Sequence, residues 1–166
     1  MEFRKSIKSD LDNIMIIIKE AQKYFKENNI DQWQDNYPNE ETILNDINNE
    51  TSYVLVKDNN IVATASISFE EEKTYKNIVE NWLTNDRYVV IHRIAVSNDY
   101  KGLRLSSTIL DNAKALALKN SIHSIKIDTH KDNKAMQRVL KKNNFTYCGI
   151  IYLEDNSERI AFEKTF

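Results

Sequence analysis

The sequence predicts a single α+β domain with a mixed central sheet of about seven strands flanked by four helices. Its 166 residues and 41% hydrophobic content suit one domain with a substantial core. Segments with alternating apolar residues are interspersed with segments in which apolar residues recur at helical spacing. One near-continuous apolar run, residues 88–96, is typical of a buried central strand. The expected order over residues 1–166 is β-α-α-β-β-β-α-β-α-β-β, without an internal repeat or linker.

The first two elements follow from alternation and helix capping. Residues 2–7 alternate as a strand does. Ser9 followed three residues later by Asp12 has the form of a capping box, which predicts a helix from there to about Glu27. The expected buried face of this helix comprises Leu11, Ile14, Met15, Ile18, Ala21 and Phe25.

The next elements are a short helix and a hairpin. An aperiodic stretch at 28–39 holds a Trp, a Tyr and the only proline, and a short helix is expected from Glu40 to Asn48. Residues 52–57 and 61–69 flank an Asp-Asn-Asn turn at 58–60, which predicts a β-hairpin.

The elements of the second half of the chain are predicted from the same apolar periodicities. Residues 70–87 show no clear pattern. A helix from Thr108 to Lys119 is expected to turn Ile109, Leu110, Ala113, Leu116 and Ala117 inward. The remaining expected elements are a strand at 124–129, a helix at 132–143 with Met136, Val139 and Leu140 inward, and a closing hairpin of 145–153 with 159–165.

Charge and composition exclude several classes of protein. Lys+Arg 23 against Asp+Glu 25 gives a net charge of -2, which favours binding to neither nucleic acid nor an anionic membrane. The single Cys148 cannot form an intrachain disulfide, and the N-terminal residues lack a secretory signal pattern. No apolar run approaches the roughly 18 residues of a membrane span. We expect a cytoplasmic protein; strand pairing near the C-terminus between two copies would give a homodimer.

The segment from Ile91 to Leu110 predicts a strand, a short polar loop and the start of a helix, where enzymes often hold a phosphate. The loop has one glycine, Gly102. The free N–H groups and the dipole of a helix N-terminus bind phosphate without requiring glycine. If residues 103–106 enter the helix with negative φ and outward side chains, their amides remain available to a pyrophosphate. The alternative is an ordinary strand-to-helix loop whose basic residues are solvated.

Two segments resemble the GNAT superfamily of acyl-CoA-dependent N-acyltransferases: IAVSNDYKGLRLS and DTHKDNKAMQRVLKKNNF. The order of the predicted elements resembles that of the family as well, so the resemblance covers nearly the whole chain. The family's pyrophosphate pattern [QR]-x-x-G-x-[GA] falls on residues 101–106, with Lys101, Arg104 and Ser106 departing from it. A second family motif matches at Asn133 and Phe145, with Asn144 replacing its glycine. The stretches IDQWQDNYPNEE, HRIAV and YCGIIYLEDNSER look like a bacterial subset with unassigned acceptors.

The resemblance implies an N-acetyltransferase that moves an acetyl group from acetyl-CoA to a primary amine of a small molecule or peptide by direct attack. It implies that the pantetheine arm lies between strands 88–96 and 124–129 and pairs with the backbone of Ile94 and Val96. Other acyl-CoA donors and a non-catalytic CoA-binding module are the alternatives. The implied cofactor-contact residues are Ile94, Ala95, Val96, Lys101, Gly102, Leu103, Arg104, Leu105, Ser106, Ser107, Asn133 and Met136.

The resemblance also implies a general base at His92, four residues before Val96, where the family often has Glu or His. A neutral imidazole accepts a proton directly or through water. The alternative is a core histidine bonded to a backbone carbonyl. The family's usual helix tyrosine, the general acid, falls on Leu140. Either the thiolate departs unprotonated, or Tyr147 or Tyr152 serves as the acid.

Aromatic residues in aperiodic segments are candidates for the acceptor site. Trp33, Tyr37 and Trp82 would wall an acceptor pocket, although large aromatics more often pack. Cys148 is expected to be structural. The run at 70–72 is expected to be a solvated acidic loop that could attract a cationic amine. His123 and His130 lack partners at metal-site spacing, so no metal site is expected.

Overall fold

The mixed α+β architecture is present in the computed structural model, which describes residues 1–166. It has eight strands and four α-helices. The strand beyond the predicted seven is β4 (Val79–Glu80), which lies within the segment 70–87, where the sequence shows no clear periodicity. Hydrogen bonds join the strands in the order β1-β2-β3-β5-β6-β8-β7-β4.

The chain divides into two compact units. Unit 1 comprises residues 1–67 and 93–109, and unit 2 comprises residues 68–92 and 110–166. Three elements contribute to both units: β5 (Val89–Val96), α3 (Leu105–Lys119) and, by its last residue alone, β3 (Asn60–Ser68). The helix α3 begins three residues before the predicted Thr108 and buries Ile109, Leu110, Ala113 and Ala117 as predicted.

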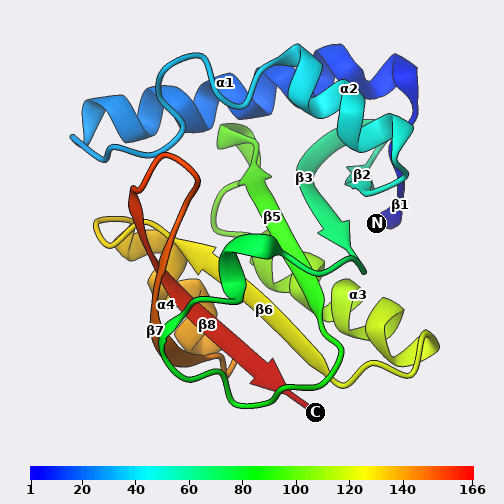
Figure 1. The fold of residues 1–166 in the computed structure, drawn as a ribbon. Helices are drawn as coiled ribbons and strands as arrows, with labels where there is room; N and C mark the ends of the chain where they lie inside the picture. The colour runs from blue at the N-terminus through cyan, green and yellow to red at the C-terminus, as the bar shows by residue number, and fades with distance from the viewer. The chain divides into compact units, whose positions relative to one another are not determined.

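Unit 1 combines two helices with an antiparallel group of strands (Figure 1). The strand β2 pairs on one side with β1 and on the other with β3, in the hairpin that the sequence predicted. The amide of Ser97, just after β5, donates to the carbonyl of Val62 in β3 (2.9 Å). Apolar side chains from both helices meet the strands in one core that includes Ile14, Ile18, Ile43 and Val54. The elements are β1 (Glu2–Lys5), α1 (Leu11–Glu27), α2 (Glu40–Asn48), β2 (Ser52–Lys57) and β3 (Asn60–Ser68).

The start of α1 differs from the prediction. Ser9 does not cap the helix; a 3-10 turn, η1 (Lys8–Asp10), precedes it. The Asp10 carboxylate accepts from the Ile7 amide (2.8 Å) and from Arg4 (2.7 Å), and the Arg4 hydrogen bond lowers the pKa of Asp10. The predicted box was therefore wrong, because the carboxylate that closes this turn belongs to Asp10. The buried face of α1 also includes Ile17.

Unit 2 has strands covered on two faces. The strand β6 pairs along its length with β8, and β8 with β7, while β4 forms an edge against β7. By contrast, β5 and β6 pair in parallel only at Val89↔Ile125 and Val90↔Lys126. In Figure 1 the segment 68–88 passes in front of these strands, and α4 lies behind them. The elements are η2 (Lys73–Tyr75), β4, β6 (Ser124–Thr129), α4 (Lys134–Lys142), β7 (Thr146–Tyr152) and β8 (Glu158–Thr165).

The end of α4 has the backbone geometry that the sequence suggested. Asn144 has φ 63°, in the left-handed region that asparagine adopts more readily than most residues. Its amide donates to Lys141 O (3.1 Å), and the Phe145 amide donates to Leu140 O (3.0 Å). This pattern is a Schellman motif, so asparagine can replace the family's glycine here.

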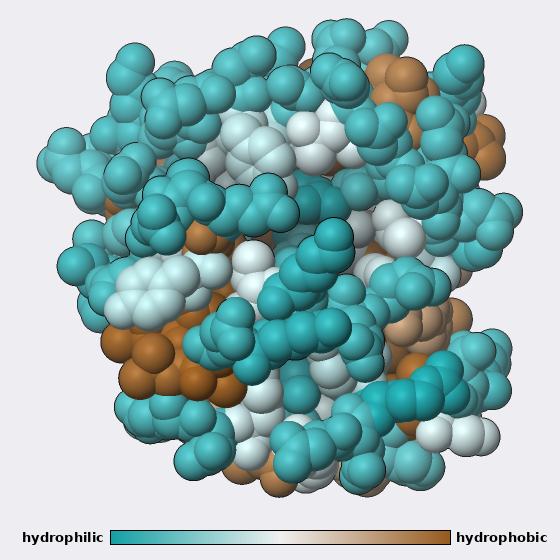
Figure 2. Space-filling view, in the orientation of Figure 1, coloured by the Kyte–Doolittle hydropathy of each residue, from teal (hydrophilic) through white to brown (hydrophobic).

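The surface shown in Figure 2 is mainly hydrophilic, with apolar side chains gathered over the part of unit 2 that holds β7. The exposed large apolar side chains of unit 2 include Val79 and Leu83. None of the helices combines the length and apolar character that crossing a membrane requires.

Candidate active site

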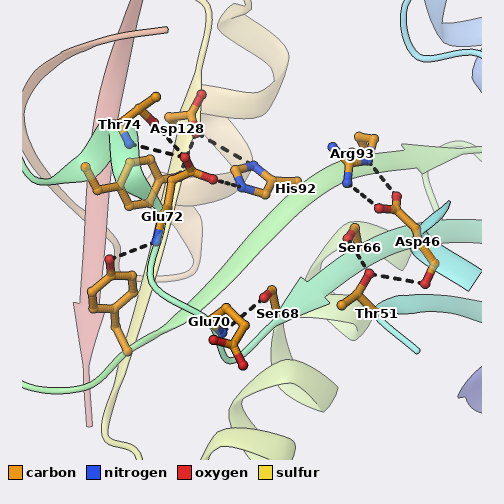
Figure 3. A network of polar contacts seen from close by, with 12 residues as sticks. Asp46, Thr51, Ser66, Ser68, Glu70, Glu72, Thr74, His92, Arg93 and Asp128 are labelled. Carbon is orange, nitrogen blue, oxygen red and sulfur yellow. Dashed lines mark hydrogen bonds and ion pairs between the residues drawn. The ribbon is translucent and has the colours of Figure 1, made fainter. Parts of the chain in front are cut away.

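His92 lies between two carboxylates in unit 2. Its Nε2 is 3.2 Å from Glu72 Oε2, and its Nδ1 is 3.8 Å from Asp128 Oδ1. Figure 3 shows the ring, carried by β5, directed toward both side chains. The parallel pairing of Val90 with Lys126 explains this geometry, because two residues further along each strand His92 and Asp128 come onto the same face. The His92 side chain is 27% exposed, so it is neither a core residue nor fully solvated.

Glu72 is fixed by several hydrogen bonds. Its Oε1 accepts from the amide (3.2 Å) and hydroxyl (3.1 Å) of Thr74, and its own amide donates to Tyr88 Oη (3.2 Å). The hydrogen bond with His92 lowers the pKa of Glu72 to about 2, against the opposing effect of burial. Glu72 is therefore ionised at neutral pH. The expectation that residues 70–72 form a solvated loop is wrong for Glu72.

Asp128 is held from its other side by Tyr75. The phenol Oη donates to Asp128 Oδ1 at 2.6 Å, and the Tyr75 side chain is buried. Burial first, and then the Asp128 charge, raise the pKa of Tyr75 well above its ordinary value. The phenol therefore keeps its proton and remains a donor to the carboxylate.

The sequence analysis proposed His92 as a general base but did not predict which residues surround it. Glu72 lies in an acidic run and Asp128 in a strand, and Tyr75 belongs to a segment without periodicity. No local pattern distinguishes them, since the contacts join residues 20 and 53 positions apart. The alternative reading of His92, a core histidine bonded to a backbone carbonyl, does not match its carboxylate neighbours.

Trp82 is engaged in packing within unit 2. Its Nε1 donates to the Tyr75 carbonyl (2.9 Å), and the Lys126 ammonium lies 4.5 Å from its ring centroid. The same ammonium lies 4.0 Å from the Tyr88 ring centroid, and burial lowers the pKa of Lys126. Part of the ring face of Trp82 is thus covered by a lysine of this chain.

A buried carboxylate ties the segment 68–88 to the strands of unit 2. Glu163 in β8 is fully buried. Its oxygens accept from the Leu83 amide (2.6 Å), the Thr84 amide (3.3 Å) and hydroxyl (2.8 Å), and the Ser124 hydroxyl (2.6 Å). This network holds the segment that carries Glu72 and Tyr75 in place.

The predicted phosphate loop lies in unit 1 and differs from the expected backbone at one residue. Arg104 has φ 58°, so the expectation of negative φ is wrong at this position. It stands where the family pattern has glycine, and a left-handed φ explains that preference. Gly102 has φ 85°, and a Cβ added there would meet nothing within 4 Å. Leu105 is buried rather than turned outward.

The start of α3 nevertheless leaves backbone donors at the loop. The amide of Thr108 donates to Arg104 O (3.1 Å) as the first bond of the helix. The amides of Leu105 and Ser106 precede it and have no acceptor within the helix. Lys101 is exposed, with its ammonium 5.1 Å from the Tyr24 ring centroid. A helix N-terminus with a neighbouring cation fits a pyrophosphate.

The other predicted residues of unit 1 lie in two places: Trp33 and Tyr37 in the segment 28–39, and Ile94 to Val96 in β5. Arg93, next to His92 in the chain, has φ 56° and binds the Asp46 carboxylate through two nitrogens (2.8 and 2.7 Å), as Figure 3 shows. Its Nη1 also donates to Tyr37 Oη (3.0 Å). Trp33 packs edge-on against Phe25, at 5.5 Å between centroids. The half-buried Ile94 and Val96 flank the buried Ala95 in β5.

The predicted residues at α4 and on β7 differ in burial: some are buried, and others are exposed to solvent. Asn133 is buried and caps α4, because its Oδ1 accepts from the amide of the half-buried Met136 (3.1 Å). Leu140 is fully buried. Tyr147 and Tyr152 are exposed on β7. Cys148 is buried, and burial raises the pKa of its thiol, as expected of a structural cysteine.

Comparisons with known proteins show where this fold occurs. The sequence profile described as the Acetyltransferase (GNAT) family matches residues 17–145. A GNAT-family acetyltransferase from Streptococcus agalactiae 2603 is 32% identical, with a TM-score of 0.90 over 99% of this chain and 95% of that chain. No curated protein sequence matches the chain.

More distant structures share the fold. A GNAT-family acetyltransferase from Listeria monocytogenes is 18% identical, with a TM-score of 0.76 over 99% of this chain and 94% of that chain. A ribosomal-protein-alanine N-acetyltransferase from Brucella melitensis is 15% identical, with a TM-score of 0.72 and full coverage of both chains. With the profile match and the 32% identical relative, the chain belongs to the GNAT acetyltransferase family.

Proposed function

We propose that this protein transfers an acetyl group from acetyl-CoA to a primary amine of a small molecule or peptide, by direct attack in a ternary complex. Membership of the GNAT family indicates acyltransferase activity. The observation that carries the finer proposal is the position of His92 between the carboxylates of Glu72 and Asp128. An amine acceptor needs both attraction as a cation and removal of a proton, and this arrangement provides both.

The proton-accepting atom in this proposal is His92 Nδ1. In the neutral ring one nitrogen donates and the other accepts. The hydrogen bond at Nε2 is the closer one, so Nε2–H donates to the ionised Glu72. Nδ1 then carries the lone pair, since its 3.8 Å separation from Asp128 is too long for a hydrogen bond. Glu72 fixes the tautomer and compensates the charge that the ring gains on accepting a proton.

Asp128 has a separate role toward the acceptor. A primary amine is mostly an ammonium ion at neutral pH. The Asp128 carboxylate, held by Tyr75, attracts that cation to the side of the ring where the Nδ1 lone pair points. The amine therefore meets a carboxylate that orients it and a base that deprotonates it.

The residues of each unit fit CoA. In unit 1 the amides of Leu105 and Ser106, with Lys101, provide donors and charge for a pyrophosphate. The backbone of Ile94 to Val96 would hold the amide-bearing arm, and the loop residues Gly102, Leu103, Arg104 and Ser107 would surround the phosphates. In unit 2 Asn133 and Met136 would contact the arm. Bound acetyl-CoA supplies the acyl group as an activated thioester.

No general acid is assigned. Leu140 occupies the family's usual tyrosine position and has no proton to donate. Tyr147 and Tyr152 on β7 are exposed phenols that could serve. Trp33, Tyr37 and Trp82 stay candidates for acceptor contact, with Tyr37 bound to Arg93 and Trp82 to Lys126.

A non-catalytic CoA-binding module is the second candidate function. Two observations favour it: the buried Leu140 at the acid position, and the left-handed Arg104 at a glycine position of the loop. Release of CoA in the presence of an amine separates the two functions, because a binding module gives none.

The test begins with thermal unfolding in the presence of acetyl-CoA, CoA, ATP or NAD. A ligand at 100 times its Kd stabilises the fold by about 2.7 kcal/mol, which raises Tm by roughly 5–11 °C for a domain of this size. We expect a shift with acetyl-CoA and CoA alone, followed by CoA release with members of an amine panel. His92→Gln should lower kcat/KM by about 100-fold at pH 7. His123→Gln, at an exposed histidine bonded to the Phe166 carbonyl, is the control. Unchanged kcat/KM for His92→Gln from pH 7 to 9 would remove its role.

A further inference from the structure

A groove of about 560 Å³ lies within unit 2, between α4 and the strands β7 and β8. In Figure 1 α4 lies behind these strands. Glu163 of β8 binds the segment 68–88, which passes in front of them, and successive side chains of a strand point to opposite faces. Phe162 therefore faces α4, and the groove lies on the other side of the strands from Glu72 and its partner His92.

The floor of the groove is apolar and mainly aromatic. The ring of Tyr147 packs edge-on against that of Phe162, at 5.9 Å between centroids. Phe162 is nearly buried, but Tyr147 is 46% exposed, so its ring offers surface to a ligand. An aromatic ligand can extend this edge-to-face arrangement. The floor comprises Phe145, Tyr147, Ile160 and Phe162.

Three lysines line the same groove: Lys131, Lys134 and Lys141. All three are exposed, and none of their ammonium groups forms an ion pair with a carboxylate. The Lys134 ammonium donates to the Lys131 carbonyl (2.8 Å). The neighbouring Asp132 carboxylate lies instead 3.8 Å from His130 Nδ1. The rim of the groove therefore carries positive charge that this chain does not compensate.

Two of these lysines stand at the unfavourable end of a helix. α4 begins at Lys134 and has no acidic side chain in its first turn. The N-terminus of a helix carries partial positive charge, which favours anions and disfavours cations. Lys131 and Lys134 add charge of the same sign there. A bound anion would compensate both the lysines and the helix end.

We propose that this groove binds a small aromatic carboxylate, at a site independent of the proposed transfer reaction. The ring of the ligand lies on the apolar floor, and its carboxylate meets the lysines. The volume is that of a small-molecule site, since such sites span roughly 300–1,000 Å³. A second copy of this chain fits less well, because a twofold interface would set the lysines of one copy against those of the other.

Isothermal titration of the full chain with 2-naphthylacetate and with its uncharged analogue 2-naphthylacetamide tests the charged rim. We expect the amide to bind more weakly than the acid by roughly 3- to 10-fold, because only the acid pairs with lysine. Lys134→Gln combined with Lys141→Gln should weaken the acid by a similar factor and leave the amide unchanged. The matched control combines Arg138→Gln with Lys142→Gln, which removes two charges from exposed positions of α4 outside the groove. It should change the Kd of the acid by less than about 2-fold in 0.15 M salt.

Two further titrations test the floor and the location. Tyr147→Ser should weaken the acid and the amide alike, because both lose the same ring contact. Saturating CoA should leave the Kd of the acid unchanged.

Five outcomes would overturn the proposal. No binding of the acid at millimolar concentration would refute it directly. Equal affinity for acid and amide would leave no role for the lysines. Equal weakening in the control variant would trace the effect to the overall charge of α4. Displacement of the acid by CoA would assign it to the cofactor site. A dimer in sedimentation experiments that Tyr147→Ser dissociates would assign the groove to a second copy of the chain.

Discussion

The Nε2 atom of His92 lies 3.2 Å from Oε2 of Glu72, and this hydrogen bond keeps the Glu72 carboxyl ionised, with a pKa of about 2. The contact joins β5 to the segment that precedes η2 within unit 2. It therefore serves both the stability of this unit and the orientation of the ring in the proposed reaction.

Glu72→Gln should make the free energy of unfolding depend less on pH. The folded-state pKa of Glu72, about 2, lies below the ordinary 4.5. The ionised carboxylate thus stabilises the fold above pH 4.5, and this contribution is lost as the pH falls through about 2. Urea unfolding should show Glu72→Gln less stable than the wild type at pH 6, with the difference shrinking toward pH 2. The control is Glu71→Gln at the exposed neighbour, and a difference that stays constant with pH would contradict the assignment.

Asp128→Asn should weaken the acceptor more than it slows the chemistry. The amide keeps the shape of the side chain but loses the charge that is proposed to attract an ammonium ion. We expect KM for the amine to rise about tenfold or more, with a smaller change in kcat, as for loss of one charged hydrogen bond. Steady-state kinetics with varied amine at fixed acetyl-CoA measures both. A fall in kcat alone would indicate that Asp128 acts on the ring of His92 instead.

Arg104→Gly should stabilise the free protein. A non-glycine residue at φ 58° carries a steric cost of about 1–2 kcal/mol, part of which is offset by the larger entropy loss of glycine on folding. We expect the free energy of unfolding to rise by about 0.5–1 kcal/mol. Arg104→Ala removes the same charge but keeps a Cβ, so it should not stabilise. If both variants gain equally in chemical denaturation, the charge of Arg104 and not its backbone is the cause.

Glu163→Ala should destabilise the protein strongly. The substitution leaves the donors of Leu83, Thr84 and Ser124 without their buried acceptor, and the nearby Lys126 without a compensating charge. We expect a loss of about 3 kcal/mol or more in the free energy of unfolding. Glu158→Ala, at the exposed start of β8, should change it by less than about 0.5 kcal/mol. Similar small losses in both variants would show that the Glu163 network is not required.

The sequence alone determined the elements whose signals lie among neighbouring residues. The apolar spacing of α1, the turn between β2 and β3 and the left-handed preference of Asn144 each depend on the local chain, and the structure has all three. The start of α1 was missed by one residue, because the Asp10 carboxylate binds the Ile7 amide and Arg4 on β1, contacts that the spacing of Ser9 and Asp12 does not reveal.

The tertiary structure decided what surrounds His92. The sequence indicated only that Glu72 belongs to an acidic run expected to be solvated and that Asp128 belongs to a strand. The parallel register of Val90 with Lys126 is what brings Asp128 close to His92. Local propensity is encoded by residues a few positions apart, whereas a site is made by segments that only strand pairing and packing bring together.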